Sequence, residues 1–375
     1  MKRVLYVVTI LPTAKAFLLP HMNMLKEKGY KVDLAGNSNS IPISNEINKV
    51  VDNVYDVKFS RKPISRTNLI SLFQMRKIIK ENNYDIVHVH TPVASFFTRL
   101  ATVFLNCRVY YTAHGFHFFK GSPIKNWMTY FVAEYLLSYV TDITFTMNRE
   151  DYKVATKYFQ NRNNKVYNTN GVGVNLSKFV PISNELKKKK RNDMFNENKL
   201  NVKLDDIIFT YVGELSNRKN QMYLLESLKD GIPNNIKFFL IGDGKNKNEL
   251  SNKINDYGLN NNVFLLGRKE NIPDWFGISD FGFSISKQEG LPVNIMEAMA
   301  VGLPILASNV RGNNDLVQDR INGYLFDLNS QANYLTQLIS DIINDENLLE
   351  YSQKSIELIE KYKIDNILLE LEKYY

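Results

Sequence analysis

Two glutamates stand eight positions apart around a turn and a predicted helix in the second half of the chain. They are Glu289 and Glu297, in the run EGLPVNIMEAMAVGLPILAS (residues 289–308). If the helix starts just after Glu289, the second carboxylate lies about 7 to 12 Å further along it. A sugar nucleotide has a similar reach from ribose to hexose. The two carboxylates are therefore predicted to accept hydrogen bonds from hydroxyl groups at both ends of such a ligand.

The residues between the two carboxylates are suited to bind phosphate. Gly290, Leu291, Pro292 and Val293 are predicted to begin the helix, with the proline in its first turn. Backbone N–H groups at a helix start lack partners within the helix and carry the positive end of its dipole. A diphosphate is therefore expected at this position.

Two cations are expected to meet the same diphosphate. In VGELSNRKNQ (residues 212–221) a predicted strand ends at Gly213, and Arg218 and Lys219 follow at the start of a helix. Arginine can hold phosphate oxygens in a fork, whereas lysine acts as a point charge. Basic residues are unfavourable at a helix start unless an anion compensates them. The alternative is that both side chains are simply solvated in the first helical turn.

Alternating strand and helix patterns predict how these residues are positioned. In both halves of the chain, runs rich in β-branched and aromatic residues precede segments with helical spacing of apolar residues, starting with VLYVVTI (residues 4–10) and DIIFTYVGEL (residues 206–215). This pattern favours parallel sheets covered on both faces. The prediction is an α/β protein with two Rossmann-like, doubly wound domains that face a cleft.

The domain boundaries are predicted where the pattern fades. We expect an acceptor-binding domain over residues 1–180 and a nucleotide-sugar-binding domain over residues 201–350. Between them, residues 181–200 are predicted to be a linker, because LKKKKRNDMFNENKLN is polar and rich in lysine. Residues 351–375 are expected to be helical and are candidates to pack back on the first domain.

Composition limits the class of protein. The chain has 375 residues, 44% of them hydrophobic, and a net charge of +8, and it holds no uninterrupted apolar run long enough to span a bilayer. Its single cysteine, Cys107, cannot form an internal disulfide, which favours a reducing compartment. Residues 1–180 hold 24 Lys and Arg against 11 Asp and Glu. This excess favours an anionic partner such as phospholipid, nucleic acid or a diphosphate, with solubility as the alternative.

Histidines in the first half are further candidates for chemistry. His114 follows a predicted strand, so its ring is expected to reach the transferred sugar or the leaving oxygen. A packed histidine at a strand end is the alternative. In the strand DIVHVH, His88 and His90 face one side. With His114 and His117 they admit a metal site, which we consider the weaker interpretation because no Asp-x-Asp pair follows a strand.

The first domain is expected to hold the acceptor. Thr13 and Lys15, in TILPTAKAF after the first strand, are candidates to meet an acceptor phosphate, although Lys15 can equally be solvated. In HGFHFFKGSPIKNW (residues 114–127) aromatic residues alternate with lysines. Such a segment suits a surface that rests on anionic lipid.

The spaced motifs of the second half resemble family 4 glycosyltransferases. The runs are YVGELSNRKNQ, FFLIGDG, VFLLGRKENIPDWFGISDFGFSIS, EGLPVNIMEAMAVGLPILAS and NGYLFD, in that order. The fourth looks like the E-x7-E motif of that family, and YYTAHGFHFF resembles the HG motif of bacterial polysaccharide glycosyltransferases. This resemblance implies a GT-B fold, transfer of a sugar with retention of anomeric configuration, and no metal cofactor.

By this resemblance, Glu289 would contact hydroxyl groups of the donor sugar and Glu297 the ribose. Lys219 would bind the donor diphosphate, and the backbone near Arg268 would read the base. His114 would lie near the anomeric centre. Many members carry an arginine directly after the glycine of the VG strand. Here that position is Glu214, so Arg218 is taken as the second cation, and the catalytic set is Glu289, His114, Lys219 and Arg218.

The function expected from the sequence is a retaining glycosyltransferase. It would move a hexose or N-acetylhexosamine from a UDP-sugar to a polyprenyl-diphosphate-linked glycan, for capsule, exopolysaccharide or O-antigen. It would be cytoplasmic and peripheral on the inner face of the cell membrane. The alternatives are a non-catalytic sugar-nucleotide-binding scaffold and a UDP-N-acetylhexosamine epimerase of the same fold. A nucleic-acid partner is not expected, because no recognised motif accompanies the basic charge.

Overall fold

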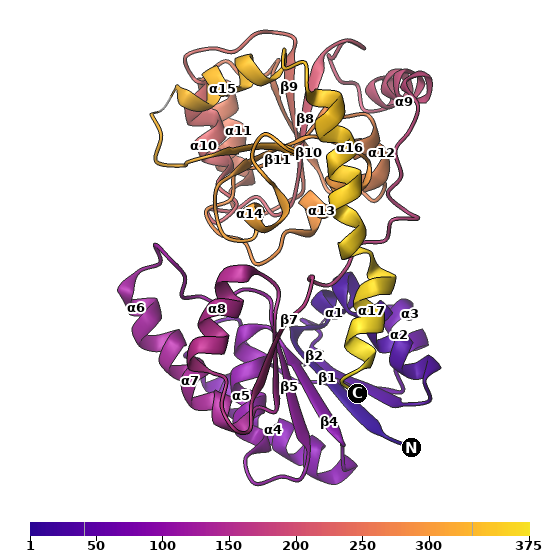
Figure 1. Ribbon diagram of the computed structural model, residues 1–375, viewed down its shortest axis with the longest axis vertical. Helices are drawn as coiled ribbons and strands as arrows, with labels where there is room; N and C mark the ends of the chain where they lie inside the picture. The colour runs from indigo at the N-terminus through magenta and orange to yellow at the C-terminus, as the bar shows by residue number, and fades with distance from the viewer. Residues whose placement is uncertain (41, 332) are drawn as a thin grey trace. The chain divides into compact units, whose positions relative to one another are not determined.

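The computed structural model describes residues 1–40, 42–331 and 333–375, which form two compact units (Figure 1). Unit 1 comprises Met1–Val172 and Asp365–Tyr375, and unit 2 comprises Gly173–Ile364. Each unit is built around one parallel sheet with helices on both of its faces. Among the described residues, no helix combines the length and hydrophobicity required to cross a bilayer.

Unit 1 contains a seven-stranded parallel sheet in the order β3-β2-β1-β4-β5-β6-β7. The central strands read as continuous runs of β-branched and aromatic residues because both of their faces are buried. The strands are β1 (Arg3–Ile10), β2 (Lys31–Asn37), β3 (Asn53–Asp56), β4 (Ile86–His90), β5 (Arg108–Ala113), β6 (Ile143–Thr146) and β7 (Lys165–Asn168).

Two hydrophobic cores lie on opposite faces of this sheet, because successive side chains of a strand point to opposite sides. Val4 and Tyr6 of β1 pack with one set of helices, and Leu5 and Val7 with the other. The first set is α1 (Leu11–Phe17), α2 (Leu19–Glu27), α3 (Asn45–Val50) and α17 (Ile364–Glu372). The second set is α4 (Arg66–Asn82), α5 (Pro92–Thr102), α8 (Arg149–Tyr158) and the continuous helical segment α6 (Ile124–Asn126), η1 (Trp127–Phe131), α7 (Val132–Leu137) and η2 (Ser138–Val140).

Unit 2 contains a six-stranded parallel sheet in the order β10-β9-β8-β11-β12-β13. Its strands are β8 (Ile207–Val212), β9 (Ile236–Ile241), β10 (Val263–Gly267), β11 (Phe281–Ser284), β12 (Ile305–Ser308) and β13 (Gly323–Phe326). Its helices are α9 (Asn184–Glu197), α10 (Gln221–Leu228), α11 (Lys247–Asp256), α12 (Ile272–Gly277), α13 (Val293–Ala300), α14 (Asn313–Leu316), α15 (Tyr334–Ile342), α16 (Leu348–Ile359) and the 3₁₀ turn η3 (Glu360–Tyr362).

The prediction of a linker over residues 181–200 is wrong in its central part, which forms α9. The hydroxyl of Ser183 caps the helix by accepting a hydrogen bond from the backbone of Leu186. Met194 and Phe195 are buried in a core cluster of unit 2. Arg191 donates to three backbone carbonyls and to the carboxylate of Asp280. The lysines of this helix are more exposed than these residues, so the buried stripe is too narrow to produce a helical pattern in the sequence.

The ends of the two units also differ from the predicted boundaries. The first part of unit 1 ends at Val172, before the predicted boundary at residue 180, and the segment 351–375 is divided between the units. Helix α16 belongs to unit 2, whereas α17 lies beside the sheet of unit 1 (Figure 1), where Ile367, Leu371 and Tyr375 are buried. Within the segment TILPTAKAF, residues 11–17 form the whole of α1.

Candidate active site

The candidate site of unit 2 lies where its sheet reverses its strand order. Strand β8 pairs with β9 on one side and with β11 on the other. In open parallel sheets, ligands bind beyond the carboxyl ends of the strands at such a reversal, because the following segments diverge there. Residues 213–219 follow β8 and residues 285–289 follow β11. These two segments carry Arg218, Lys219 and Glu289, three residues that the sequence singled out.

The structure brings these three side chains into contact. The Nζ atom of Lys219 lies 2.5 Å from Oε1 of Glu289, and Nη1 of Arg218 lies 3.2 Å from Oε2. Arg218 also donates to the backbone carbonyl of Gln288 at 3.0 Å, and the N–H of Lys287 donates to the carbonyl of Arg218 at 2.9 Å. Lys219 and Glu289 are buried, whereas the side chain of Arg218 is 46% exposed. The segments after β8 and β11 are therefore joined by both side chains and backbone.

Two opposing effects decide the charge of Glu289. Burial acts to raise its pKa, but the positive charges of Lys219 and Arg218 outweigh burial, so the pKa lies below the usual value for a glutamate. With Glu289 ionised, the three groups together carry one net positive charge. A site of this kind offers a carboxylate that can accept hydrogen bonds from hydroxyl groups and a partly exposed guanidinium that can bind an anion.

The turn that holds Glu289 is supported by residues that the sequence analysis did not identify. Nε of Arg311 donates to the carbonyl of Glu289 at 3.0 Å. Gly312 has φ +85°, and a Cβ atom there would lie 2.6 Å from the carbonyl oxygen of Gly290. Glycine is therefore required where the segment after β12 crosses this turn. The signal for both residues is the run NVRG (residues 309–312) directly after the strand ILAS.

The helix after the turn starts later than the sequence predicts. Pro292, predicted in the first turn, is the N-cap residue of α13, which begins at Val293. Proline has no N–H group, so the donors at this helix start are the first backbone N–H groups from Val293 onward. Gly290 and Leu291 lie in the turn between Glu289 and this cap. The predicted phosphate-binding segment is thus at a helix start, as expected, with the proline just outside the helix.

Glu297 lies on α13, one to two turns after the helix start. Among the described residues, its carboxyl group has no hydrogen-bond partner. Burial raises its pKa to about 7, against a weaker opposing effect of the positive charge of Lys178. Its environment therefore differs from that of Glu289, since no cation contacts it. A half-buried carboxyl without a partner is suited to receive hydroxyl groups of a ligand.

The other predicted donor-binding residues lie at the same edge of the sheet. Gly213 directly follows β8, and a Cβ atom on Gly242, which follows β9, would lie 1.9 Å from the carbonyl oxygen of Gly213. Arg268 directly follows β10 and is exposed. Because β9 separates β10 from β8, Arg268 stands two strands away from the segment that carries Lys219.

In unit 1, His114 directly follows β5 and contacts another histidine. Its Nε2 atom lies 3.1 Å from Nδ1 of His90. Burial lowers the pKa of His114 to about 4, so this ring is neutral at physiological pH. His88 bonds through Nδ1 to the hydroxyl of Tyr375 and through Nε2 to Thr112 at 2.7 Å.

These contacts bear on the alternative of a metal site. His88 uses both of its ring nitrogens in hydrogen bonds within the core of unit 1. The ring of His117 lies against the ring of Tyr130, with centroids 4.7 Å apart. In the ranges that the structure describes, no three His, Cys, Asp or Glu side chains are grouped so that they could hold a metal ion. Two of the four histidines thus have ring nitrogens or a ring face in contact with other residues of unit 1.

Unit 1 has its own reversal of strand order, between β1 and β4, and a pocket of about 270 Å³ adjoins it. Thr9 and Thr91, at the ends of these strands, share a hydrogen bond of 2.7 Å between their hydroxyl oxygens. Thr91 has φ +66°, an unfavourable conformation for a β-branched residue. The pocket is lined by Thr9, Ile10, Thr13, Arg61, Pro63, Thr91, Pro92, Val93, His117 and Tyr130.

Of the two predicted acceptor-binding residues, only Thr13 lines this pocket. Lys15 lies on the same helix but lines a separate pocket and forms an ion pair of 3.0 Å with Glu46. The exposed cation at the first pocket is Arg61, which the sequence analysis missed. The segment around Arg61 has no regular pattern, so no sequence signal connects it with the ends of β1 and β4.

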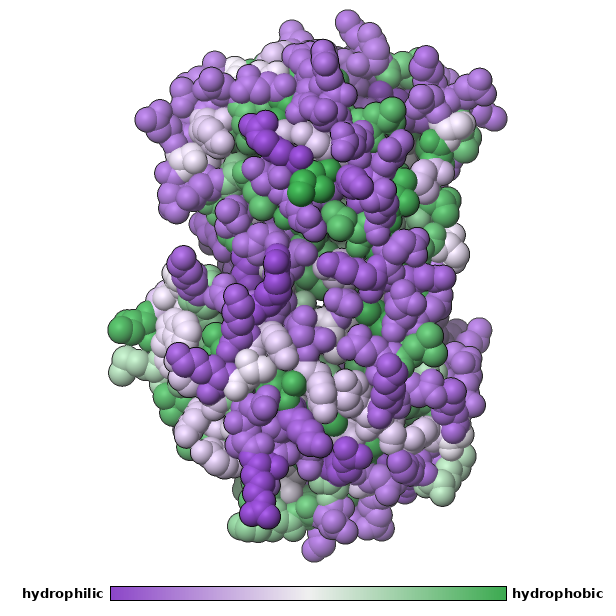
Figure 2. Space-filling model, in the orientation of Figure 1, coloured by the Kyte–Doolittle hydropathy of each residue, from purple (hydrophilic) through white to green (hydrophobic). Residues whose placement is uncertain are grey.

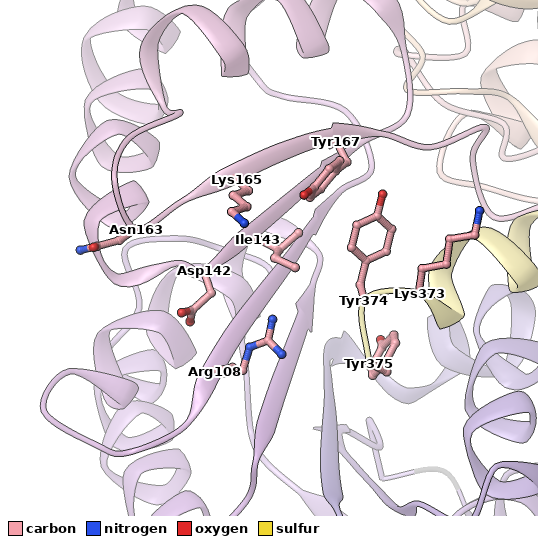
Figure 3. Close-up of a pocket in the computed structure, with 9 residues that line it drawn as sticks. All are labelled: Arg108, Asp142, Ile143, Asn163, Lys165, Tyr167, Lys373, Tyr374 and Tyr375. Atoms are coloured by element: carbon pink, nitrogen blue, oxygen red, sulfur yellow. The ribbon is translucent and has the colours of Figure 1, made fainter.

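A further pocket, of about 410 Å³, lies at the opposite edge of the unit 1 sheet (Figure 3). Arg108, Ile143 and Lys165 are the first residues of β5, β6 and β7, so this pocket adjoins the amino ends of the strands. Tyr374 and Tyr375 form its other side (Figure 3). Ligand sites of parallel sheets lie at the carboxyl ends, and we therefore assign the reaction to the other edge.

Comparison with known proteins identifies the class of enzyme. Residues 3–147 match the family described as glycosyl transferase 4-like, and residues 192–358 match the family described as glycosyl transferases group 1. The chain is 32% identical over 345 residues to a protein of Bacillus subtilis named as a glycosyltransferase, EpsD, covering 90% of this chain and 86% of that protein. The chain therefore belongs to the glycosyl transferases group 1 family and is a glycosyltransferase, as the sequence predicted.

Another relative has a more specific name. A UDP-Gal:α-D-GlcNAc-diphosphoundecaprenol α-1,3-galactosyltransferase of Escherichia coli is 31% identical over 296 residues, covering 76% of this chain and 73% of the enzyme.

Solved structures confirm the GT-B fold. HepE from Anabaena, solved with UDP and glucose, has a TM-score of 0.78 at 18% identity, covering 100% of this chain and 99% of that one. Sucrose-phosphate synthase from Thermosynechococcus elongatus has a TM-score of 0.79 at 15% identity, covering 100% of this chain and 98% of that one. At these identities the similarity concerns the fold alone.

Proposed function

We propose that this protein transfers a hexose or N-acetylhexosamine from a UDP-sugar to a polyprenyl-diphosphate-linked glycan, with retention of anomeric configuration, in the synthesis of a bacterial surface polysaccharide. The E. coli relative supports this proposal, because its name states a UDP-sugar donor and a diphosphoundecaprenol-linked acceptor. The single observation that carries the proposal is the contact of Glu289 with Lys219 and Arg218 at the strand reversal of unit 2.

In this proposal the donor lies along the segments after β8 and β11. Its diphosphate meets the guanidinium of Arg218, the ammonium of Lys219 and the first N–H groups of α13. Glu289 accepts hydrogen bonds from the sugar, and Glu297 accepts them from the ribose. The base lies toward Arg268. The carboxyl of Glu297 supports this role, since it has no other hydrogen-bond partner among the described residues and its pKa of about 7 allows it to ionise when hydroxyl groups approach.

Catalysis would depend chiefly on stabilising the leaving group. As the bond between C1 of the sugar and the diphosphate oxygen breaks, negative charge develops on that oxygen, and the two cations and the helix start stabilise it. The acceptor hydroxyl attacks C1 from the same face, and its proton passes to the departing diphosphate. The neutral ring of His114 would hydrogen-bond to the sugar. Because protein cations and a helix dipole do this work, the proposal requires no metal cofactor.

The acceptor is assigned to the pocket at the strand reversal of unit 1. Arg61 is exposed at this pocket and forms no ion pair within the described residues, and the hydroxyls of Thr9, Thr13 and Thr91 add hydrogen-bonding groups. An arginine beside hydroxyl groups is suited to a diphosphate. A polyprenyl chain attached to this diphosphate would remain in the membrane, and the enzyme would therefore act as a cytoplasmic protein peripheral to it.

The proposal is tested by following nucleotide release. The purified protein is incubated with a panel of UDP-, GDP- and TDP-sugars, with and without polyprenyl-diphosphate-linked oligosaccharides, and nucleoside diphosphate is quantified by chromatography. We expect release of UDP from one donor, increased by a lipid-linked acceptor. Tight binding of UDP without release from any donor would instead favour a non-catalytic protein of this fold.

A further inference from the structure

A continuous helical segment of unit 1 exposes a stripe of large apolar side chains. The segment runs from α6 through η1 and α7 to η2, over residues 124–140. Ile124, Met128, Val132 and Leu136 follow one another at intervals of four residues, which keeps them on one side of the helix. Their exposed fractions range from 46% to 77%. The opposite side of the segment carries Trp127 and Phe131, which pack against the core.

Neighbouring helices on the same face of the sheet extend this stripe. Helix α4 packs against α5, and α5 packs against α7. On α4, Leu69, Ile70 and Phe73 are exposed by 55%, 67% and 70%, and after α5 Phe104 is almost fully exposed. We call the outward side of these helices the apolar helix face. Figure 2 shows hydrophobic side chains at the surface in the region where Figure 1 draws α6.

The charges around the apolar helix face have one dominant sign. Residues 57–140 contain eleven Lys and Arg but only three Asp and Glu. The carboxylate of Glu134 is directed inward to the buried Arg99, 2.7 Å away. Seven cations of this region are exposed and form no ion pair within the described residues: Arg61, Lys62, Arg66, Lys80, Arg108, Lys120 and Lys125. This combination of apolar side chains and uncompensated cations is complementary to a surface with an anionic exterior and an apolar interior.

The apolar helix face is continuous with the pocket assigned to the acceptor. Pro63 lines that pocket, and Ile64, the next residue, is fully exposed just before α4. Tyr130 lines the pocket from η1, in the same helical segment as Met128. Arg61 therefore stands where the pocket meets the face. A ligand whose diphosphate occupies the pocket would have its hydrocarbon chain beside these apolar residues.

We propose that the apolar helix face lies on an anionic lipid bilayer, with Ile124, Met128 and Phe73 inserted among the lipids and Lys120 and Lys125 at the level of the phosphates. This inference rests on the proposed function, in which the acceptor is held in a membrane by its polyprenyl chain. A bilayer fits better than a protein partner because lysine is depleted in protein interfaces. Tyr135 and Tyr139, which hydrogen-bond to each other at 3.0 Å, end the stripe with polar groups suited to the interfacial region.

The test measures binding of the full chain to vesicles, without donor or acceptor. Flotation is compared for vesicles of phosphatidylcholine and of phosphatidylcholine mixed with phosphatidylglycerol. We expect binding to the anionic vesicles only, decreasing with salt. The affinity of Ile124→Ser/Met128→Ser for the anionic vesicles should fall by at least about tenfold. Lys120→Glu/Lys125→Glu should also lose binding to these vesicles. Because all four side chains are exposed, thermal unfolding of both variants should match the unchanged protein.

Matched controls separate this face from a general effect of hydrophobicity or charge. Leu349→Ser removes a similarly exposed side chain from α16, and Lys188→Glu/Lys189→Glu makes the same charge change on α9. Both controls should bind vesicles as the unchanged protein does. Equal vesicle binding by Ile124→Ser/Met128→Ser would overturn the proposal. The proposal would also be overturned if the unchanged protein did not bind vesicles but associated with itself, and if Ile124→Ser/Met128→Ser abolished that self-association. Neither result depends on the sugar that is transferred, because vesicle binding is measured without donor or acceptor. Turnover is measured separately, with acceptor dispersed in detergent.

Discussion

Lys219 and Glu289 form a buried ion pair of 2.5 Å between the segments that follow β8 and β11. The two strands are neighbours in the sheet, although more than sixty residues separate these segments in the chain. This ion pair therefore both joins the two segments and contributes to the charge of the site. A substitution of either residue leaves the other one buried without its main partner of opposite charge. Arg218 is half exposed and can still bind an anion.

Breaking this pair should cost stability as well as activity. Lys219→Ala leaves the buried carboxylate of Glu289 with only Arg218, and we expect a loss of about 3 kcal/mol in the free energy of unfolding. The control is Lys229→Ala, whose exposed pair with Glu226 spans 3.9 Å and should contribute less than about 1 kcal/mol. Urea denaturation measures both. Equal effects in the two variants would show that the buried pair has no special structural role.

Arg218 allows activity to be tested with little effect on the fold, because its side chain is half exposed. Arg218→Ala should decrease kcat by about 100-fold, since a donor to the developing negative charge is lost. Arg218→Lys should restore part of this loss. If Arg218→Ala retains near-normal turnover, the cation that replaces the arginine missing at Glu214 must be sought elsewhere.

The raised pKa of Glu297 predicts that the stability of the protein depends on pH. Its pKa is raised from 4.5 to about 7 by burial, so the neutral carboxyl favours the folded state at low pH, and this contribution is lost as the pH rises toward 7. Glu297→Gln should therefore melt at a higher temperature than the unchanged protein above this pKa, and at a similar temperature near pH 5.

The same variant tests the role of Glu297 in ligand binding. The ionised carboxylate is the better acceptor for ribose hydroxyls, so affinity for UDP should rise with pH through about 7, and this rise should be absent in Glu297→Gln. Calorimetric titration at several pH values measures it. A pH-independent affinity in the unchanged protein would contradict contact between this carboxyl and the ribose.

His114 should act without changing its charge. Because burial lowers its pKa to about 4, the ring remains neutral above about pH 5. The pH profile of kcat/KM should therefore show no inflection near the usual histidine pKa. His90→Phe, which removes the bond to Nε2 of His114, should lower kcat more than it raises the KM of the donor, because the orientation of the His114 ring is lost. An inflection near 6.5 that disappears in His114→Asn would show that the ring titrates during turnover.

Arg61 should act on the acceptor alone. Arg61→Ala is expected to raise the KM of the lipid-linked acceptor by about tenfold, which corresponds to the loss of a charge-assisted contact, and to leave the KM of the donor unchanged. Lys15→Ala serves as the control, because Lys15 is paired with Glu46 outside this pocket. Equal effects on both substrates would place Arg61 outside the acceptor site.

The sequence predicted which residues come together in unit 2 better than which come together in unit 1, for a physical reason. Gly213, Lys219 and Glu289 follow strands, and strand ends of a parallel sheet meet at one edge whatever the strand order. The contact between Lys219 and Glu289 depends on β8 lying next to β11, which no local pattern reveals. Arg61 lies in an irregular segment, so its position beside Thr9 and Thr91 follows only from the fold.

Helix α9 shows the same limit for secondary structure. Its burial depends on Arg191, Met194 and Phe195, whereas the rest of the helix is polar. The three carbonyls and the carboxylate that receive the hydrogen bonds of Arg191 come from residues that are distant in sequence or lie outside the helix. Tertiary contacts thus stabilise a segment whose composition is typical of a linker.

The most direct test of the account compares UDP release by the unchanged protein and by Arg218→Ala, with the donor sugar identified from the panel and a polyprenyl-diphosphate-linked glycan as acceptor. We predict that release requires the acceptor, is accompanied by a glycolipid product that retains the anomeric configuration of the donor, and falls by about 100-fold in the variant. Release that does not depend on the acceptor, or an unchanged rate in Arg218→Ala, would contradict it.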